Sequence, residues 1–198
     1  MWWKDAQQDI TDSYECSSYQ ANTNNLHERE ATLESQQWRK PHQGFLKCNY
    51  DCSLFRTGEN GKAGWIIRDD RRFFIEATQS RGKPCNSVIE AELHALLMVM
   101  QHTWIRGYRN ITFKGDNKQI PHLINGEIQN FGVHNLTKEV QTRQKRFTNA
   151  TFTWIPRHCN KAADCLAKKL IPANVNFIQH FFVPRSLVQI LHEDHFSN

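Results

Sequence analysis

Four acidic residues are the strongest candidates for catalytic residues in this sequence. They are Asp51, Glu92, Asp116 and Asp164. Two belong to strand-like runs and two to helix-like segments, so folding can bring them together at one edge of a sheet. Nothing local in the sequence neutralises four anions there, and hard oxygen donors without His or Cys are typical ligands of Mg²⁺ or Mn²⁺. Two such ions about 3.5–4 Å apart can activate a water and stabilise the leaving oxygen in phosphodiester hydrolysis.

Glu92 shows most clearly that packing alone does not explain these acids. It falls on a predicted helix that is capped at Asn86 or Ser87 and continues to about Trp104. The residues three, four and seven positions away from it are apolar: Val88, Ile89, Ala95, Leu96 and Val99. A carboxylate buried on such a stripe without a partner is costly. Glu90 instead shares a face with polar residues, and we expect it to be an ordinary surface acid.

Each of the other three acids also has an ordinary structural explanation. Asp51 lies on the polar side of an alternating strand, which can be a solvent-facing edge. Asp116 can cap the helix that follows it, and Asp164 can favour the dipole of the last helix. Asp116 nevertheless ends its strand at a place where parallel sheets gather ligands. The convergence of all four residues, rather than any single one, favours a metal site.

Alternating apolar residues, turn signals and helix caps predict the elements that must position these acids. We expect an antiparallel meander of three strands, then a helix and a strand that can pair in parallel, two more helices, and a final strand and helix. The predicted ranges are strands at 45–55, 63–68 and 73–78, a helix at 87–104, a strand at 110–114, helices at 118–124 and 136–147, a strand at 151–155 and a helix at 160–170.

Composition divides the 198 residues into three parts. We expect a polar N-terminal arm or linker at 1–44, one domain at 45–171, and a C-terminal extension with a short helix at 172–198. The arm carries four Lys or Arg against seven Asp or Glu, which leaves the rest of the chain with a net charge of +8. A basic surface suits a polyanionic partner through phosphate contacts and counterion release.

Several classes of protein are disfavoured by the sequence. No apolar run approaches the ~20 residues of a membrane-spanning helix and the N-terminus is charged, so we expect an intracellular protein of nucleus or cytoplasm with no membrane partner. Glycine-rich phosphate loops, GxSxG elbows and HExxH pairs are missing from the sequence. Six scattered cysteines are expected to stay reduced: Cys16, Cys48, Cys52, Cys85, Cys159 and Cys165. A zinc site could be built from Cys48, Cys52, His158 and Cys159. The spacing of these residues is not that of zinc fingers, so we do not favour it.

Five segments carry a resemblance to a known family. They are WRKPHQGFLKCNYDCS, GKAGWIIRDD, IEAELHALL, FKGDNKQIPHLIN and WIPRHCNKAADCLAKKL, in the stretch from Gln37 to Lys169. In order and approximate spacing they resemble the type 1 ribonuclease H domain of plant retroelement-related, reverse-transcriptase-like proteins. The tail FFVPRSLVQILHEDH resembles the segment that follows such domains.

The resemblance implies an α/β ribonuclease H-like fold, with a five-stranded mixed sheet flanked by helices. It also implies cleavage of the RNA strand of RNA–DNA hybrids with two Mg²⁺ ions, for which Mn²⁺ can substitute, by a protein that we take to be a monomer. By motif position, the catalytic and metal-binding acids are Asp51, Glu92, Asp116 and Asp164. Recognition through 2′-hydroxyls and backbone shape implies low base specificity.

Two departures from the family pattern bear on activity. Cys52 follows Asp51 where the family usually has glycine, so its side chain can crowd a backbone that should approach the hybrid. His158 is a doubtful equivalent of the mobile histidine of bacterial relatives, because the loop before the last acid is short; an auxiliary role and a surface histidine both remain open. Asn160 either orients substrate or caps the last helix, with capping favoured.

Further residues have both a binding and a structural interpretation. Phosphate contacts or solvated surface charges are expected at Lys118, Arg143, Lys145, Arg146 and Arg157. The aromatics Trp65, Phe113 and Trp154 are predicted to be core residues rather than base-stacking platforms. In the C-terminal extension, one helix face can dock on the domain or bind a partner; it comprises Leu187, Ile190 and Leu191.

Two functions from different classes follow. The first is a metal-dependent endoribonuclease that cleaves the RNA strand of RNA–DNA hybrids. The second is a catalytically impaired, nucleic-acid-binding remnant of a retroelement ribonuclease H domain, to which Cys52 and the short loop at His158 would point. Another nuclease of the same fold, such as a 3′ to 5′ exonuclease, would share the four acids but act on ends.

Overall fold

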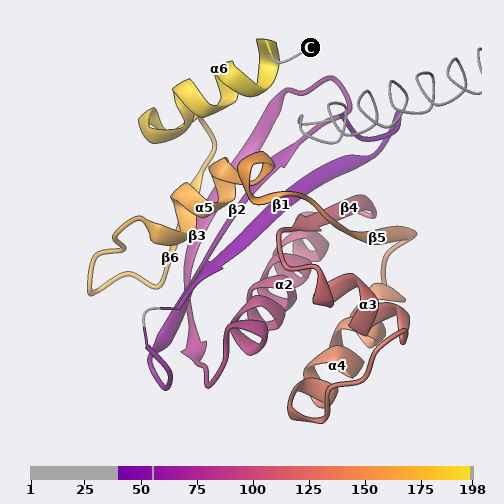
Figure 1. Cartoon of the computed structure of the whole chain (residues 1–198). Helices are drawn as coiled ribbons and strands as arrows, with labels where there is room; N and C mark the ends of the chain where they lie inside the picture. The colour runs from indigo at the N-terminus through magenta and orange to yellow at the C-terminus, as the bar shows by residue number, and fades with distance from the viewer. Residues whose placement is uncertain (1–39, 55, 197–198) are drawn as a thin grey trace, which may run out of the picture. The chain divides into compact units, whose positions relative to one another are not determined.

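The computed structural model describes residues 40–54 and 56–196 (Figure 1). These residues belong to one compact unit, Trp38–Asn198. Most of the predicted arm, and Cys16 within it, lies outside the described residues.

The unit is built on a mixed sheet, as predicted. Its strands are β1 Leu46–Ser53, β2 Asn60–Arg68, β3 Phe74–Pro84, β4 Asn110–Gly115, β5 Asn149–Trp154 and β6 Phe177–His180. The order across the sheet is β5-β4-β1-β2-β3-β6. β1, β2 and β3 form the predicted antiparallel meander, and β1, β4 and β5 are parallel.

The sheet has six strands rather than the predicted five. The additional strand, β6, comes from the C-terminal extension and pairs antiparallel with β3 through Ala77–Ser80. Its four residues are too few to show a periodic pattern in sequence, and it forms because β3 would otherwise leave an unpaired edge.

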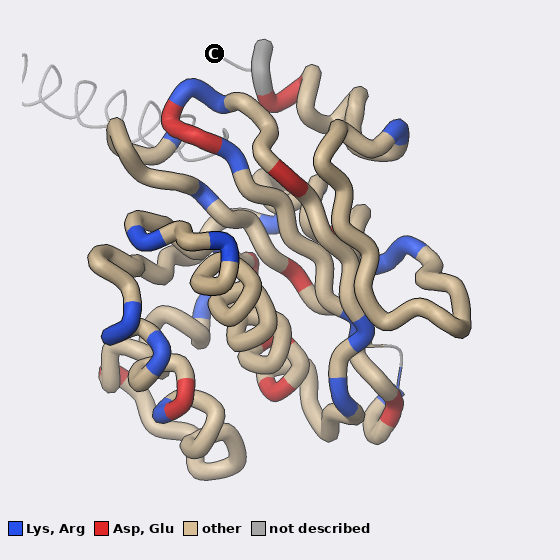
Figure 2. The backbone as a smooth tube through the Cα atoms, turned by 180° about the vertical axis from the view of Figure 1, so that it is seen from behind, with Lys and Arg blue, Asp and Glu red and all other residues tan. Residues whose placement is uncertain are grey.

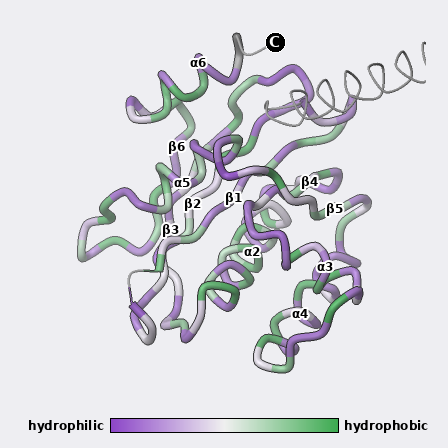
Figure 3. Tube along the Cα trace, viewed as in Figure 1, coloured by the Kyte–Doolittle hydropathy of each residue, from purple (hydrophilic) through white to green (hydrophobic). Residues whose placement is uncertain are grey.

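The helices occupy the two faces of this sheet. Their bounds are α2 Val88–Ile105, α3 Gln119–Asn125, α4 His134–Gln144, α5 Lys161–Lys168 and α6 Val188–Phe196, with short 3₁₀ turns at Phe131–Val133, Arg157–Cys159 and Arg185–Leu187. The face covered by α2, α3 and α4 carries the larger core, and the face covered by α5 and α6 carries a smaller one (Figure 1). Hydrophobic stretches interrupted by hydrophilic residues run along α2 (Figure 3).

The helix that carries Glu92 begins and ends as local signals predict. Ser87 Oγ accepts a hydrogen bond from the Glu90 backbone N–H at 3.2 Å, and the Glu90 carboxylate accepts one from Asn86 N–H at 2.7 Å. Ser87 is thus the N-cap, and Glu90 also holds the backbone of the residue before the cap. Gly107, at φ 81°, follows the last turn, where a left-handed backbone favours glycine.

Close packing fixes α5 against β2. A Cβ on Gly64 would lie 2.3 Å from the Ala167 backbone N, so a side chain there would push the helix away. The predicted apolar face of the C-terminal extension docks on this same side of the domain: Leu187, in the 3₁₀ turn before α6, is fully buried, and Ile190 and Leu191 of α6 pack against the smaller core.

Two further sequence expectations can be compared with the described residues. No helix among them is long and apolar enough to span a membrane. The five described cysteines form no disulfide bond with one another, and the candidate zinc ligands Cys48, Cys52, His158 and Cys159 do not form a metal-ligand group in this part of the chain.

Candidate active site

Three of the four predicted acids come together at one end of the sheet. Asp51 in β1, Glu92 in α2 and Asp116 after β4 each place a carboxylate oxygen within 4.8 Å of the other two. β1 and β4 pair in parallel from Leu46–Asn49 to Ile111–Lys114, so the residues that follow each paired segment lie at the same edge. The early turns of α2 bring Glu92 to that edge.

This cluster is largely removed from solvent. Asp51 and Glu92 are each 4% exposed and Asp116 is partly buried. Glu92 Oε2 is buried and has no hydrogen-bond partner. Carboxylates held this close need bound protons or a cation, and an all-oxygen donor set suits Mg²⁺ or Mn²⁺. Among the residues that the structure describes, no other group of three or more Asp, Glu, His and Cys side chains converges in this way.

The electrostatics of the cluster favour bound protons when no cation is present. Burial, and then the charge of Asp116, raise the pKa of Asp51 to about 7, while the Cys52 backbone N–H, 2.8 Å from Asp51 Oδ1, acts in the opposite direction. Burial, with Asp51 and Asp116 adding to it, also raises the pKa of Glu92 well above its ordinary value. Burial raises the pKa of Asp116, against the effect of the Arg157 guanidinium. A divalent cation would replace these protons.

Asp164 lies beside this cluster rather than within it. Asp164 contributes to the raised pKa of Asp51, but its carboxylate is outside the three-residue group. Its oxygens accept hydrogen bonds from Lys168 Nζ at 2.7 Å and from Arg157 Nη2 at 3.4 Å. The fourth predicted ligand therefore flanks the other three, and its charge is shared with two basic groups.

Cys52 faces the interior of the domain. Its side chain packs against the larger core and lines a small cavity with Cys85 and Ala91. The neighbouring Cys52 thiol lowers the pKa of Glu92, against the effect of burial. Burial and the charge of Glu92 raise the pKa of the thiol. In this orientation the side chain points toward α2, so the crowding of a bound substrate that we expected from it does not follow from its position.

Gly115 lets the third acid approach the other two. A Cβ on Gly115 would lie 2.7 Å from Cζ and 2.8 Å from Oη of the buried Tyr50. β4 can therefore reach Asp116 only if the preceding residue has no side chain.

Comparison with known proteins gives the family. The sequence profile of a family described as reverse transcriptase-like matches residues 49–170. The chain belongs to this family. No curated protein sequence matches the chain.

Solved structures share the fold of this reverse transcriptase-like domain. The ribonuclease H1 of the archaeon Halobacterium salinarum is 18% identical, with a TM-score of 0.57, and the match covers 62% of this chain and 94% of that one. The N-terminal ribonuclease H domain of a Mycobacterium tuberculosis protein is 18% identical, with a TM-score of 0.54 over 62% and 90% of the chains. A compost metagenome ribonuclease H1 in complex with an RNA/DNA hybrid is also 18% identical, with a TM-score of 0.53 over 61% and 92%. The domain therefore has the ribonuclease H fold.

Three predicted accessory residues lie on the surface beside the acids. Arg157 and His158 form the turn before α5, and both are exposed. The charge of Arg157 lowers the pKa of both Glu92 and Asp116. Burial has the larger effect on each, and it raises the pKa. Lys118 is exposed two residues after Asp116.

Asn160 does not make the side-chain cap that we favoured for it. It occupies the N-cap position of α5, but its side chain makes no capping bond. Instead, it is 1% exposed, its Nδ2 donates to the Tyr50 carbonyl at 2.9 Å, and its Oδ1 accepts from Asn49 Nδ2 at 3.1 Å. The amide therefore ties the start of α5 to β1, and it reaches substrate only if that tie breaks.

The prediction that three aromatics belong to the core is right for two of them. Trp65 and Phe113 are almost fully buried, whereas Trp154 is 39% exposed and belongs to neither core. The strand carrying Trp154, β5, is the edge of the sheet, and most of its residues are exposed. A strand-like pattern does not distinguish an edge from a central position, which is why sequence reasoning missed this residue.

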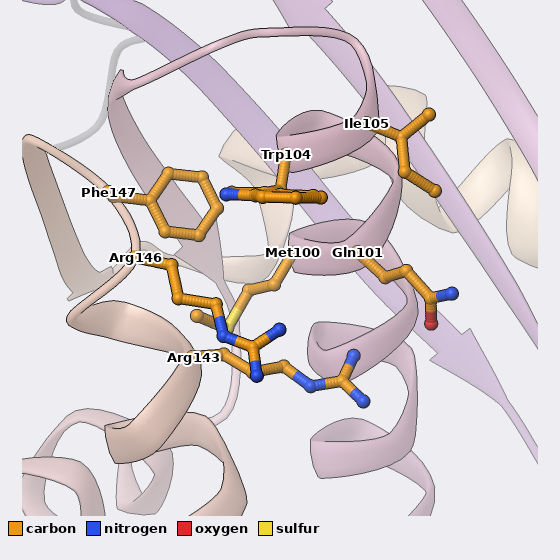
Figure 4. Close-up of a pocket in the computed structure, with 7 residues that line it drawn as sticks. All are labelled: Met100, Gln101, Trp104, Ile105, Arg143, Arg146 and Phe147. Atoms are coloured by element: carbon orange, nitrogen blue, oxygen red, sulfur yellow. The ribbon is translucent and has the colours of Figure 1, made fainter.

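The basic residues of the α4 region gather away from the acids. Lys and Arg follow one another along α4 and the turn after it (Figure 2). Arg143 and Arg146 line a cavity of about 210 Å³ with Met100, Gln101, Trp104, Ile105 and Phe147 (Figure 4). This cavity lies at the C-terminal half of α2, whereas Glu92 lies near the N-terminal end. Arg143 is also held by Glu139 and by the Leu97 carbonyl.

Proposed function

We propose that the chain is a metal-dependent endoribonuclease that cleaves the RNA strand of RNA–DNA hybrids. The observation that carries the proposal is the buried cluster of Asp51, Glu92 and Asp116, in which Glu92 Oε2 has no protein partner. Burying a carboxylate without a partner is costly, so a buried cluster of three carboxylates indicates a bound ligand. The ligand that suits three carboxylates is a hard divalent cation.

Each acid has a distinct part in this proposal. Asp51, Glu92 and Asp116 would hold Mg²⁺, or Mn²⁺ in its place, and Asp164 would complete the site for a second ion from its flanking position. Two bound ions would supply an activated water and charge stabilisation at the leaving oxygen. The Cys52 backbone N–H orients Asp51, the Asn160 bridge holds α5 against β1, and the packing of Gly115 on Tyr50 sets the position of Asp116.

The proposed substrate is supported by charge and by one structural relative. The chain is basic outside its N-terminal part, and Lys118 and Arg157 are exposed beside the acids, where they can contact phosphates. The compost ribonuclease H1 that shares the fold was solved with an RNA/DNA hybrid. Because such a duplex is recognised by shape and 2′-hydroxyls, low base specificity is expected.

One observation favours the alternative of a catalytically impaired nucleic-acid-binding remnant. Asp164 is already compensated by Lys168 and Arg157, which can compete with a second ion. In that case the folded protein would bind hybrid in a salt-dependent way without cutting it.

Cleavage of a labelled RNA–DNA hybrid in Mg²⁺ tests the proposal, beside single-stranded RNA and duplex RNA. We expect cleavage of the hybrid alone, lost in Asp116→Asn. A circular RNA strand in the hybrid separates an endonuclease, which cuts it, from an exonuclease, which does not. Equal inertness of the wild type and Asp116→Asn, with hybrid binding retained, would leave the remnant as the function.

A further inference from the structure

Trp154 is an exposed aromatic residue attached to one of the candidate metal ligands. Its indole Nε1–H donates to the Asp116 backbone carbonyl at 3.0 Å. The backbone next to it is fixed in the same way, because Ile155 N–H donates to the Gly115 carbonyl at 3.0 Å. The ring is thus held in a defined orientation at the end of β5, although 39% of the residue is exposed.

A cation lies on this ring. Lys118 Nζ is 4.4 Å from the centroid of Trp154, within the range of a cation–π interaction. Lys118 is exposed, so its ammonium group remains open to an anion on the side away from the ring. The pair offers an aromatic surface and a positive charge a few residues from Asp116.

Core packing does not account for this arrangement. Among the residues that the structure describes, Trp154 neither belongs to nor packs against either of the two cores. A tryptophan fixed by a hydrogen bond, with a lysine on its ring, is suited to a ligand that has both a ring able to pack on an indole and a phosphate, which is the chemistry of a nucleotide.

We propose that Trp154 and Lys118 form a nucleotide-binding platform, which contacts the RNA strand beside the phosphate that is cut. The sugar of a flanking nucleotide packs on the indole and its phosphate binds Lys118. This inference rests on the proposed function and deepens it. The bond from Trp154 to Asp116 also makes Trp154 a positioning residue, because a nucleotide on the platform is held in fixed register with a metal ligand.

The chain contains a matched control for this pair. Trp104 is 41% exposed and also carries a cation, with Arg109 Cζ 5.0 Å from its ring. It lies twelve residues after Glu92 on α2, which corresponds to about 18 Å along the helix. In Figure 4 its ring lies beside Phe147, above Arg143 and Arg146.

The test is hybrid binding by the full chain carrying Asp51→Asn, which prevents cleavage in Mg²⁺. Fluorescence anisotropy with a labelled hybrid would be measured over a range of salt concentrations. Adding Trp154→Ala should weaken hybrid binding about tenfold, and adding Trp154→Phe should weaken it by less. Adding Trp104→Ala should leave hybrid binding unchanged within measurement. Adding Lys118→Met should weaken binding and reduce the slope of log affinity against log salt by about 1.

The outcomes separate this inference from the function on which it rests. Hybrid binding that Trp154→Ala and Lys118→Met leave unchanged would overturn the platform while the nuclease proposal stands. If neither the chain with Asp51→Asn alone nor the wild type in chelator binds the hybrid, the platform and the nuclease proposal are both overturned. If Trp154→Ala unfolds, as circular dichroism would show, the exposed Lys118→Met variant decides the question, since its side chain supports no core.

Discussion

The thiol of Cys52 is a neighbour of the Glu92 carboxylate and lowers the pKa of Glu92, against the effect of burial. A residue that departs from the family pattern thus lies beside a candidate metal ligand. The thiol favours the ionised form of Glu92, the form that binds metal, in a place where burial opposes ionisation.

Replacing Cys52 should therefore change metal affinity more than fold. In Cys52→Ala this effect of the thiol is lost, the pKa of Glu92 rises further, and Mg²⁺ affinity near pH 7 should fall by about two- to tenfold, which corresponds to a polar contact of about 1 kcal/mol. Cys52→Ser keeps a donor and should bind close to wild type. Isothermal titration at pH 7 and pH 8.5 checks this, since higher pH should restore part of the loss; equal affinities of the three proteins would remove the role of the thiol.

The metal-free protein should lose stability as pH rises from about 4 to 7. Asp51 has a raised pKa of about 7 in the folded protein against an ordinary value of 3.8, so over this interval the folded state holds a proton that the unfolded state has released. Stability falls wherever the folded state binds more protons, here by a contribution on the order of 4 kcal/mol.

Thermal unfolding in chelator at pH 4.5 and pH 7.5 measures this effect. The melting temperature should fall with pH in the wild type and fall much less in Asp51→Asn, and Mg²⁺ should restore stability at pH 7.5 only in the wild type. A wild-type protein whose metal-free stability does not change between these pH values would show that Asp51 titrates normally.

Glu76 should give the opposite dependence on pH. This buried carboxylate accepts hydrogen bonds from His102 and Gln179, each at 2.7 Å, and lies 3.2 Å from Arg106 Nε. Burial acts to raise its pKa, but these partners outweigh it and lower the pKa. Its contribution to stability is thus present above the ordinary carboxyl pKa and is lost as pH falls through the lowered value.

Substitution of Glu76 tests that contact, which also joins β6 to α2 and β3. Glu76→Gln should destabilise the domain by about 3 kcal/mol at pH 7, because buried partners lose their charge complement. The exposed Glu59→Gln should be neutral. Urea unfolding measures both, and a neutral Glu76→Gln would show that the buried group contributes nothing net.

Gly115→Ala should disturb the acids through the fold. The added Cβ would meet the Tyr50 ring at 2.7 Å, so β4 must shift, at a cost of about 1–3 kcal/mol and with weaker Mg²⁺ binding. Gly61→Ala is the control, because its Cβ would have no neighbour closer than 3.9 Å. Denaturant unfolding and metal titration of both variants check this, and equal behaviour would contradict the packing argument.

Much of the fold could be predicted because its signals are local. The cap expected at Asn86 or Ser87 indicated where α2 begins, and the apolar neighbours of Glu92 indicated burial in a helix. Features that depend on distant partners could not be predicted in this way. β6 needs the open edge of β3, the exposure of Trp154 depends on β5 being the last strand, and Asn160 found its partners 110 and 111 residues away rather than in its own helix.

The same distinction applies to the acids. Strand and helix patterns indicated that four carboxylates could meet, but they could not show that Asp164 would be paired with Arg157 and Lys168 at the margin. Those ion pairs depend on how the turn before α5 and α5 itself place the side chains of Arg157, Asp164 and Lys168. A periodic pattern in the sequence does not encode this placement.

The most direct test of the central claim compares two neighbouring glutamates of α2. Glu92 lies in the buried cluster, whereas Glu90 is a partly exposed capping residue two positions earlier. Cleavage of an RNA–DNA hybrid in Mg²⁺ should fall by at least about a hundredfold in Glu92→Gln and remain near wild type in Glu90→Gln, because only the first removes a metal ligand. Equal cleavage by Glu92→Gln and wild type, or cleavage that persists in chelator, would contradict the account.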